Sequence, residues 1–164
     1  MTKILLQTLL DECGACHICE MVCSLHHDGE CSPALSRIRV LRGEMKETLL
    51  VCRQCEVLFC AAACPEGAIR RDPDSGVIRV DADRCNGCQR CREACPFQAI
   101  AFDAAKRRAL ICDQCGGMPQ CAAWCPRDAL RVEPFSAESR ALQAAEGEKA
   151  FALLQLIRPR LRQG

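Results

Sequence analysis

Two pairs of short stretches in the middle of the chain alternate apolar and polar residues. Alternation at every second residue is typical of a half-buried strand, and residues that favour turns separate the members of each pair. We therefore expect two small β-hairpins. The first joins residues 68–71 to 76–80, and the second joins 99–102 to 108–111.

The last thirty residues follow a helical period instead. Ser136 is a suitable N-cap, Glu138 lies in the first turn, and Pro159 is expected to end or kink the helix. The apolar face of such a helix either packs on the chain's own body or docks on a partner, and periodicity alone does not distinguish these two possibilities. We predict a docking tail at 134–164 after a cluster-binding domain at 1–133. The apolar face holds Ala150, Leu153, Leu154, Ile157 and Leu161.

The chain has few large aromatic side chains from which to build a conventional hydrophobic core. The 164 residues include five Phe, one Trp and no Tyr, but 17 Cys. A small chain of this kind usually depends on disulfides, metals or a partner for stability. The formal net charge of +1 gives no strong case for nucleic-acid binding. Residues 1–7 lack the features of a secretion signal and no apolar run is long enough for a membrane span, so we expect a cytoplasmic protein.

Sixteen of the cysteines fall into four groups of four, and the second, third and fourth groups end in Cys-Pro. Group one is Cys13, Cys16, Cys19 and Cys23; group two is Cys52, Cys55, Cys60 and Cys64; group three is Cys85, Cys88, Cys91 and Cys95; group four is Cys112, Cys115, Cys121 and Cys125.

The spacing favours 4Fe-4S clusters over other uses of cysteine. Group three has the spacing of the bacterial ferredoxin motif C-x2-C-x2-C-x3-C-P. Structural zinc usually takes two separated pairs of ligands, and disulfides need an oxidising compartment and would leave one cysteine over. All the ligands are cysteines, so no iron stays open for substrate, which argues against an enzyme.

The groups also predict local structure. Three closely spaced cysteines on a loop can each bind a different iron, whereas the fourth is expected to begin a short helix that points away and to ligate the neighbouring cluster. The following proline fits the first turn of such a helix. Glycines inside the loops suit positive φ or close approach to a cluster: Gly14, Gly87, Gly116 and Gly117.

The groups repeat as a duplicated unit. Groups one and three have the tight x2-x2-x3 spacing, whereas groups two and four have a wider loop and open with Cys-x-Gln-Cys. The predicted fold class is therefore α+β, with duplicated bacterial-ferredoxin-like modules, short β-hairpins, cluster-binding loops and a C-terminal helix.

Over residues 3–133 the chain resembles the four-cluster electron-transfer subunits of molybdenum and tungsten oxidoreductases. Besides the four groups in this order, the resemblance rests on Cys23-Ser24-Leu25-His26-His27 and on Pro33-x-x-Ser36-Arg37-Ile38. The chain looks most like the small subunit of bacterial tungsten aldehyde oxidoreductases, found in anaerobic metabolism. The resemblance implies a catalytic molybdenum or tungsten subunit as one partner, a flavoprotein or ferredoxin as the second, and self-association as a further contact.

The family pattern also implies how the groups combine, with group one exchanging its fourth cysteine with group four, and group two with group three. Spacing alone leaves the exchange of one with two and three with four open. The implied ligand sets are Cys13, Cys16, Cys19 and Cys125 for the first cluster; Cys52, Cys55, Cys60 and Cys95 for the second; Cys85, Cys88, Cys91 and Cys64 for the third; and Cys112, Cys115, Cys121 and Cys23 for the fourth.

Several residues near the groups have open roles. Cys31 is expected to be a small buried hydrophobe, since every group is already complete. His17 is expected to be an exposed loop residue, and His26 and His27 to pack beside the first cluster. Two arginines of group three either hold a cluster electrostatically or face solvent, namely Arg90 and Arg92.

The predicted function is electron transfer by four 4Fe-4S clusters between a catalytic oxidoreductase subunit and another redox partner. The alternatives are a free polyferredoxin and the electron-transfer subunit of a hydrogenase, formate dehydrogenase or carbon monoxide dehydrogenase. A cluster protein that senses or binds nucleic acid is disfavoured because no basic helix or recognisable binding domain is present.

Overall fold

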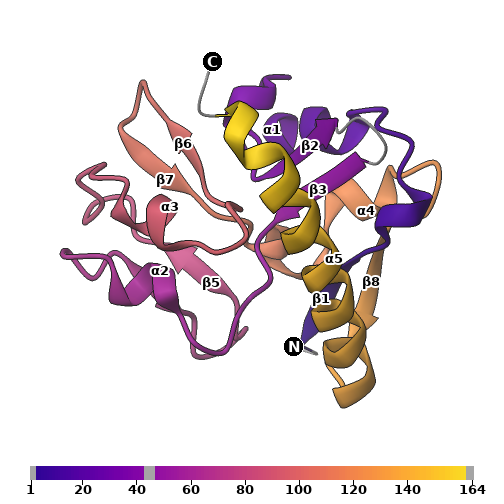
Figure 1. Ribbon diagram of the computed structural model, residues 1–164. Helices are drawn as coiled ribbons and strands as arrows, with labels where there is room; N and C mark the ends of the chain where they lie inside the picture. The colour runs from indigo at the N-terminus through magenta and orange to yellow at the C-terminus, as the bar shows by residue number, and fades with distance from the viewer. Residues whose placement is uncertain (1–2, 43–46, 162–164) are drawn as a thin grey trace.

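The computed structural model describes residues 3–42 and 47–161 of the chain. Figure 1 shows two lobes side by side, with one long helix running across them. The central lobe comprises residues 52–111 and holds cysteine groups two and three. The terminal lobe comprises residues 3–42, 47–51 and 112–161 and holds groups one and four.

Two antiparallel strand pairs build the terminal lobe. β1 (Ile4–Thr8) pairs with β8 (Leu130–Pro134), which brings the start of the chain against residues more than 120 positions away. β2 (Ile38–Arg42) pairs with β3 (Glu47–Val51). Leu5, Leu6, Leu49 and Leu50 are all buried, so β1 and β3, one strand of each pair, bury consecutive positions rather than one face.

The helices of the terminal lobe follow its cysteine groups. α1 (Ile18–Asp28) contains Cys19 and Cys23, and it packs against α4 (Gln120–Ala123). α1 ends at Gly29, which has a φ of 75° and donates its N–H to the carbonyl of Leu25 at 3.0 Å. Short 3-10 turns occur at η1 (Leu10–Glu12), η2 (Pro33–Leu35) and η3 (Gln114–Gly117).

The central lobe has much shorter elements. Its two hairpins are β4 (Ile69–Arg71) with β5 (Ile78–Val80), and β6 (Ala101–Asp103) with β7 (Arg108–Leu110). Its helices are single turns, α2 (Phe59–Ala62) and α3 (Arg90–Ala94), which pack on each other. These are the two hairpins that the alternating pattern predicts, and with the C-terminal helix they confirm the predicted fold class.

Each lobe has its own apolar cluster with cysteines inside it. The terminal cluster is built on Leu6, Ile38, Leu49 and Leu130, and the central cluster on Ile69, Ile78 and other aliphatic residues. Cys52 is partly buried and packs against both clusters, so it lies at the seam between the lobes.

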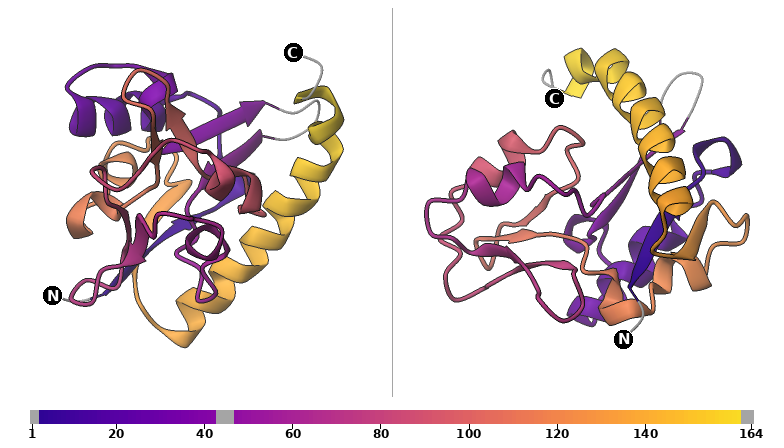
Figure 2. Two further views of the ribbon diagram at one scale, coloured as in Figure 1. Left: turned by 90° about the vertical axis from the view of Figure 1, so that its left-hand side faces the viewer. Right: turned by 90° about the horizontal axis from the view of Figure 1, so that it is seen from below.

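α5 (Ala137–Leu161) packs on the chain's own body. It contacts β1 and β3, and Ala150 and Leu154 are both only 2% exposed. Figure 2 shows the helix lying along the side of the molecule over its whole length. The predicted cap is present, since Ser136 Oγ accepts the N–H of Ser139 at 3.1 Å.

These contacts change two expectations for the tail. The apolar face predicted for docking turns inward, because Ala150 belongs to the terminal apolar cluster, Leu153 packs against that cluster and Leu154 is buried. The helix also continues past Pro159 to Leu161. A proline so close to the helix end removes only one backbone hydrogen bond of the last turns. Docking of the segment on a partner stays a prediction, and it would have to use the outward face, where Leu142 and Phe151 are exposed.

Polar contacts join the lobes. Asp28, at the end of α1, forms ion pairs with Lys106 at 3.5 Å and Arg108 at 3.4 Å in the β6–β7 hairpin, and with Arg37 beside it. Across the seam, Gln54 Nε2 donates to the carbonyl of Cys112 at 2.8 Å. Polar contacts between the lobes therefore include both ion pairs and a hydrogen bond at the seam.

Among the described residues, none of the helices combines the length and apolar character that a membrane span requires.

Candidate metal centres

The cysteine loops use left-handed backbone at equivalent places. Ala15, Gln54 and Gln114 each stand two residues after the first cysteine of a group, and their φ values are 48°, 51° and 56°. At each of these positions the backbone N–H donates to the sulfur of that first cysteine. Non-glycine residues rarely adopt such φ values, so the three groups share one strained turn that turns an amide toward a thiol.

Group three has Gly87 at the equivalent position, with a φ of 75°. A Cβ there would lie 2.4 Å from the carbonyl oxygen of Arg107, so the loop excludes any larger residue. Gly116 and Gly117 also have positive φ as expected, whereas Gly14 does not.

A second repeated contact involves the third cysteine of each group. Its sulfur accepts a backbone N–H from the next residue at Cys19, Cys60, Cys91 and Cys121. In groups two, three and four this cysteine lies in a short helix, and the fourth cysteine follows the helix end. The expectation that the fourth cysteine begins a helix is therefore wrong, because the one-turn helix is already complete and the Cys-Pro pair enters a turn.

Burial and neighbouring thiols raise the thiol pKa values. Burial is the largest cause for Cys19 and Cys52, whose pKa values rise to about 12, and for Cys91, whose value rises to about 11. These thiols would be protonated at neutral pH without a metal. Because iron binds the thiolate, cluster assembly at these sites releases protons.

Thiols distant in sequence lie close enough to act on each other's charge. After burial, the charges of Cys125 and Cys16 raise the pKa of Cys13. The charges of Cys55, Cys60 and Cys95 raise the pKa of Cys52 in the same way. Cavities lie at both places. One cavity is lined by Cys13, Cys16, Cys19 and Cys125, and the other by Cys52, Cys55, Cys60 and Cys95.

The remaining thiols gather in the same way. After burial, the charges of Cys64 and Cys85 raise the pKa of Cys91, and the charges of Cys23 and Cys115 raise the pKa of Cys121. These neighbours come from the groups that the family resemblance combines, one with four and two with three. Their role as cluster ligands stays a prediction at this point.

The donor chemistry of these places fits iron–sulfur clusters. Thiolate sulfur is the ligand of 4Fe-4S clusters, and amide N–H groups directed at the sulfurs are one of the features that tune such clusters. Across the part of the chain that the structure describes, the only histidine–cysteine group close enough to share a metal is His26, His27 and Cys115. Since Cys115 already belongs to a thiol set, we assign no separate metal to that group.

The neighbouring residues are placed differently from expectation in two cases. His27 lies beside group four rather than the first cluster, with Nε2 3.7 Å from Cys115 Sγ and 3.4 Å from Asp113 Oδ1. Cys31 is exposed, not buried, because it follows α1 in an irregular segment at the surface. His17 contacts Glu20, with Nδ1 2.6 Å from Oε2.

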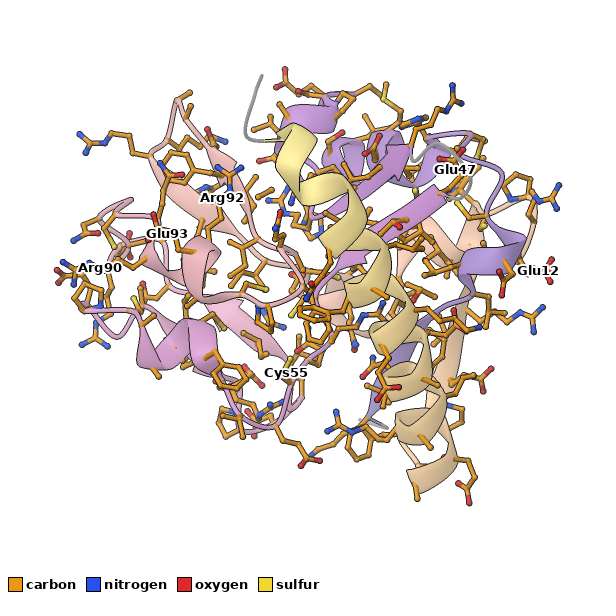
Figure 3. The ribbon with its side chains drawn as sticks, viewed as in Figure 1. Glu12, Glu47, Cys55, Arg90, Arg92 and Glu93 are labelled. Carbon is orange, nitrogen blue, oxygen red and sulfur yellow. The ribbon has the colours of Figure 1, made fainter. Side chains whose placement is uncertain are left out.

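Arg90 and Arg92 are both exposed, and Figure 3 shows them around α3 in the central lobe. Of the two roles left open for them, the structure therefore supports the solvent-facing one. Sequence reasoning missed the charged residues inside the wide loops, Arg53 and Asp113, since a single sequence shows neither the burial of Arg53 nor the partners of Asp113.

Fold and site together define an iron–sulfur protein of the ferredoxin type. The sequence pattern of the 4Fe-4S dicluster domain family matches residues 44–134, more than half of the chain, and the chain belongs to that family. It is an electron-transfer protein that carries 4Fe-4S clusters.

Several curated proteins are similar over part of their length. Escherichia coli YsaA is 40% identical over 111 residues, which cover 62% of this chain and 69% of YsaA. The polyferredoxin-like subunit of the aliphatic sulfonate oxidoreductase of Pyrococcus furiosus is 38% identical over 106 residues, covering 63% and 60%. The electron transport protein HydN of E. coli is 41% identical over 96 residues, covering 54% of each chain.

A solved structure shares the fold over the whole chain. A chain of the BamBC active site complex of benzoyl coenzyme A reductase, determined with 1,5-dienoyl-CoA, aligns with a TM-score of 0.50. The alignment covers 100% of this chain and 99% of that one at 19% identity. This likeness shows the fold alone.

Proposed function

We propose that the chain is the electron-relay subunit of a tungsten or molybdenum oxidoreductase and that it carries four 4Fe-4S clusters. The observation that carries the proposal is that cysteines of groups one and four line one cavity and cysteines of groups two and three line another. Each cluster would exchange one electron at a time, at a potential set by hydrogen bonds, charge and exposure.

The first proposed cluster is held by Cys13, Cys16, Cys19 and Cys125. The second is held by Cys52, Cys55, Cys60 and Cys95, the third by Cys85, Cys88, Cys91 and Cys64, and the fourth by Cys112, Cys115, Cys121 and Cys23. Every set has four thiols, so no iron keeps an open position for substrate. The chain would therefore transfer electrons without a reaction of its own.

Electrostatic influences between thiols of different sets support one order for the proposed relay. Cys19 of the first set influences Cys121 of the fourth, and Cys52 of the second set influences Cys112 of the fourth. Cys60 of the second set influences Cys91 of the third. These neighbours support a linear order: first, fourth, second, third.

The two ends of this order are also where ligands reach the surface. Of the sixteen proposed ligands, only Cys16 in the first set and Cys88 in the third are exposed. Electrons would enter or leave at these two places, whereas the second and fourth clusters pass them through the interior.

The partner is the finer part of the proposal. The Pyrococcus relative is named as a subunit of an oxidoreductase, which supports membership in such a complex. We propose a catalytic tungsten aldehyde oxidoreductase subunit at one end and a flavoprotein or ferredoxin at the other, in the cytoplasm of an anaerobe. A free polyferredoxin, or a subunit of a hydrogenase, formate dehydrogenase or carbon monoxide dehydrogenase, is the alternative.

Anaerobic purification of the chain from its native host tests the partner. The expected result is a stoichiometric complex that contains tungsten or molybdenum besides iron. A complex with nickel would support the hydrogenase or carbon monoxide dehydrogenase alternative. Recovery of the chain alone, loaded with iron and active with small redox dyes, would support a free polyferredoxin and overturn the complex.

A further inference from the structure

The duplication places residues of opposite charge at equivalent positions of two loops. Group two opens with Cys52-Arg53-Gln54-Cys55, and group four with Cys112-Asp113-Gln114-Cys115. The two glutamines share the left-handed conformation, with φ values of 51° and 56°, so both loops begin with the same backbone turn. One loop therefore carries a cation where its counterpart carries an anion.

Arg53 is held inside the protein by the C-terminal helix. It is 6% exposed, its Nη1 donates to the carbonyl of Gln143 at 3.3 Å, and its guanidinium lies 5.8 Å from the ring centre of Phe97. Its Nη2 is buried without a hydrogen-bond partner.

Glu146 has the largest electrostatic influence on this guanidinium among the acidic groups around it, followed by Cys55 and Cys52 of its own loop. The charge of Glu146 is already shared, because one of its oxygens accepts the N–H of Leu10 at 3.1 Å and the other pairs with Lys149 at 2.6 Å. Lys149 also pairs with Asp11 at 3.3 Å, so the charge of Glu146 belongs to an ion-pair network with Lys149 and Asp11. Arg53 is the cation inside the loop of the second thiol set.

Asp113 occupies the matching place in the other loop. Its Oδ1 accepts the N–H of Cys115 at 3.0 Å, and His27 Nε2 lies 3.4 Å from the same oxygen. Arg37, Arg79 and Arg108 line the pocket that Asp113 also lines. Each of these arginines is paired with another aspartate, and the pairs are Arg37 with Asp28, Arg79 with Asp72, and Arg108 with Asp28 and Asp103.

Each of the two charges lies beside thiols of its own loop. Arg53 lines the same cavity as Cys52, Cys55, Cys60 and Cys95, whereas Asp113 accepts the N–H of Cys115. A cation favours the more negative, reduced state of a nearby cluster, and an anion favours the oxidised state.

We propose that Arg53 and Asp113 set the direction of electron flow between the two interior clusters, by making the second cluster easier to reduce than the fourth. When one electron moves from the fourth cluster to the second, the fourth is oxidised and the second is reduced, and no other reactant is needed. The equilibrium would then favour electrons in the central lobe, toward Cys88. This inference rests on the proposed four-cluster relay.

The test is a redox titration of the anaerobically purified, cluster-loaded chain, followed by electron paramagnetic resonance. Cys95→Ala and Cys23→Ala, each lacking one proposed ligand, assign the signals of the second and fourth clusters. Asp113→Asn keeps the acceptor for the Cys115 N–H and removes only the charge. Arg53→Gln removes the opposite charge, and Arg53→Lys retains it.

Arg53→Gln should lower the potential of the second cluster, and Asp113→Asn should raise that of the fourth. The expected size is about tenfold in each one-electron equilibrium constant, or about 59 mV. Arg53→Lys should keep most of the difference between the two clusters. Two exposed control variants, Arg70→Gln and Asp74→Asn, should move neither potential.

The outcomes separate this inference from the proposed function. A chain that binds far less iron than four clusters require contradicts the relay itself. Full iron content with unchanged or oppositely shifted potentials in Arg53→Gln and Asp113→Asn overturns the inference alone. If Arg53→Gln fails to retain clusters, Asp113→Asn and Arg53→Lys still decide the matter, because both preserve the hydrogen-bonding capacity of the site.

Discussion

The two lobes bind the same kind of cysteine group but are built from different amounts of conventional structure. The terminal lobe has four five-residue strands, an 11-residue helix and the 25-residue α5. The central lobe has four three-residue strands and helices of four and five residues. Hairpins this short are not stable alone, so the central lobe must depend more on its clusters.

Removing the clusters should have the largest effect and should separate the lobes. When iron is chelated anaerobically, we expect amide hydrogen exchange to lose protection in β4–β5 and β6–β7 well before β1–β8. The reason is that metal-binding energy is folding energy where little other core exists. Equal loss of protection in both lobes would contradict the comparison.

Loss of one exchanged cysteine should have the next largest effect. Cys64→Ala is expected to remove the cluster of group three while that of group two survives, because Cys64 acts on Cys91. Electron paramagnetic resonance and iron content measure this. Cys31→Ala is the matched control, since Cys31 is exposed and belongs to no set. Selective loss of the group-two cluster would contradict the exchange of cysteines between groups two and three.

The ion pairs of Asp28 sharpen the comparison because they tie the lobes together. The Asp28 side chain is 2% exposed, so Asp28→Asn leaves Arg37 without its partner, and breaking such a buried pair costs about 3–5 kcal/mol. Denaturant unfolding of the cluster-loaded protein measures the loss. The exposed Asp74→Asn should change stability little; an equal effect of both variants would argue against the tie.

The same carboxylate predicts a pH dependence. Burial acts to raise the pKa of Asp28, but the hydrogen bond and charge of Arg37 outweigh it, so the folded-state pKa lies below the usual value. The stability it provides is therefore present above the unfolded-state pKa and is lost as pH falls through the folded-state pKa. Asp28→Asn should flatten the acid side of the stability profile.

The smallest expected effect compares two leucines of α5. Leu154→Ala should cost about 2–5 kcal/mol because the side chain is buried in the terminal core, whereas Leu142→Ala should stay within about 0.5 kcal/mol because Leu142 is exposed. Unfolding in denaturant measures both. If Leu142→Ala instead weakens the assembly of a complex, the outward face of α5 is the docking surface.

Much of the local structure could be predicted from the sequence. Alternation located the hairpins at 69–71 with 78–80 and at 101–103 with 108–110, and Ser136 marked the start of α5. The pairing of Ile4–Thr8 with Leu130–Pro134 has no such signal, because a pairing between distant segments leaves no mark in either one. For the same reason periodicity gave the apolar face of α5 but not what covers it.

The candidate site divides in the same way. Spacing alone located all sixteen cysteines of the four groups, because cluster geometry constrains neighbouring residues. It could not show that Gln54 and Gln114 adopt positive φ, nor that Arg53 is buried, because both depend on segments far away in the chain. Charge sign and burial must be known together before a loop residue can be related to a redox potential.

The most direct test of the account is the iron and acid-labile sulfide content of the anaerobically purified chain, measured with zinc in the same sample. Four clusters require about sixteen irons and sixteen sulfides per chain, with zinc at background level. About eight irons would mean that only two of the four thiol sets hold clusters, and stoichiometric zinc in place of iron would contradict the account entirely.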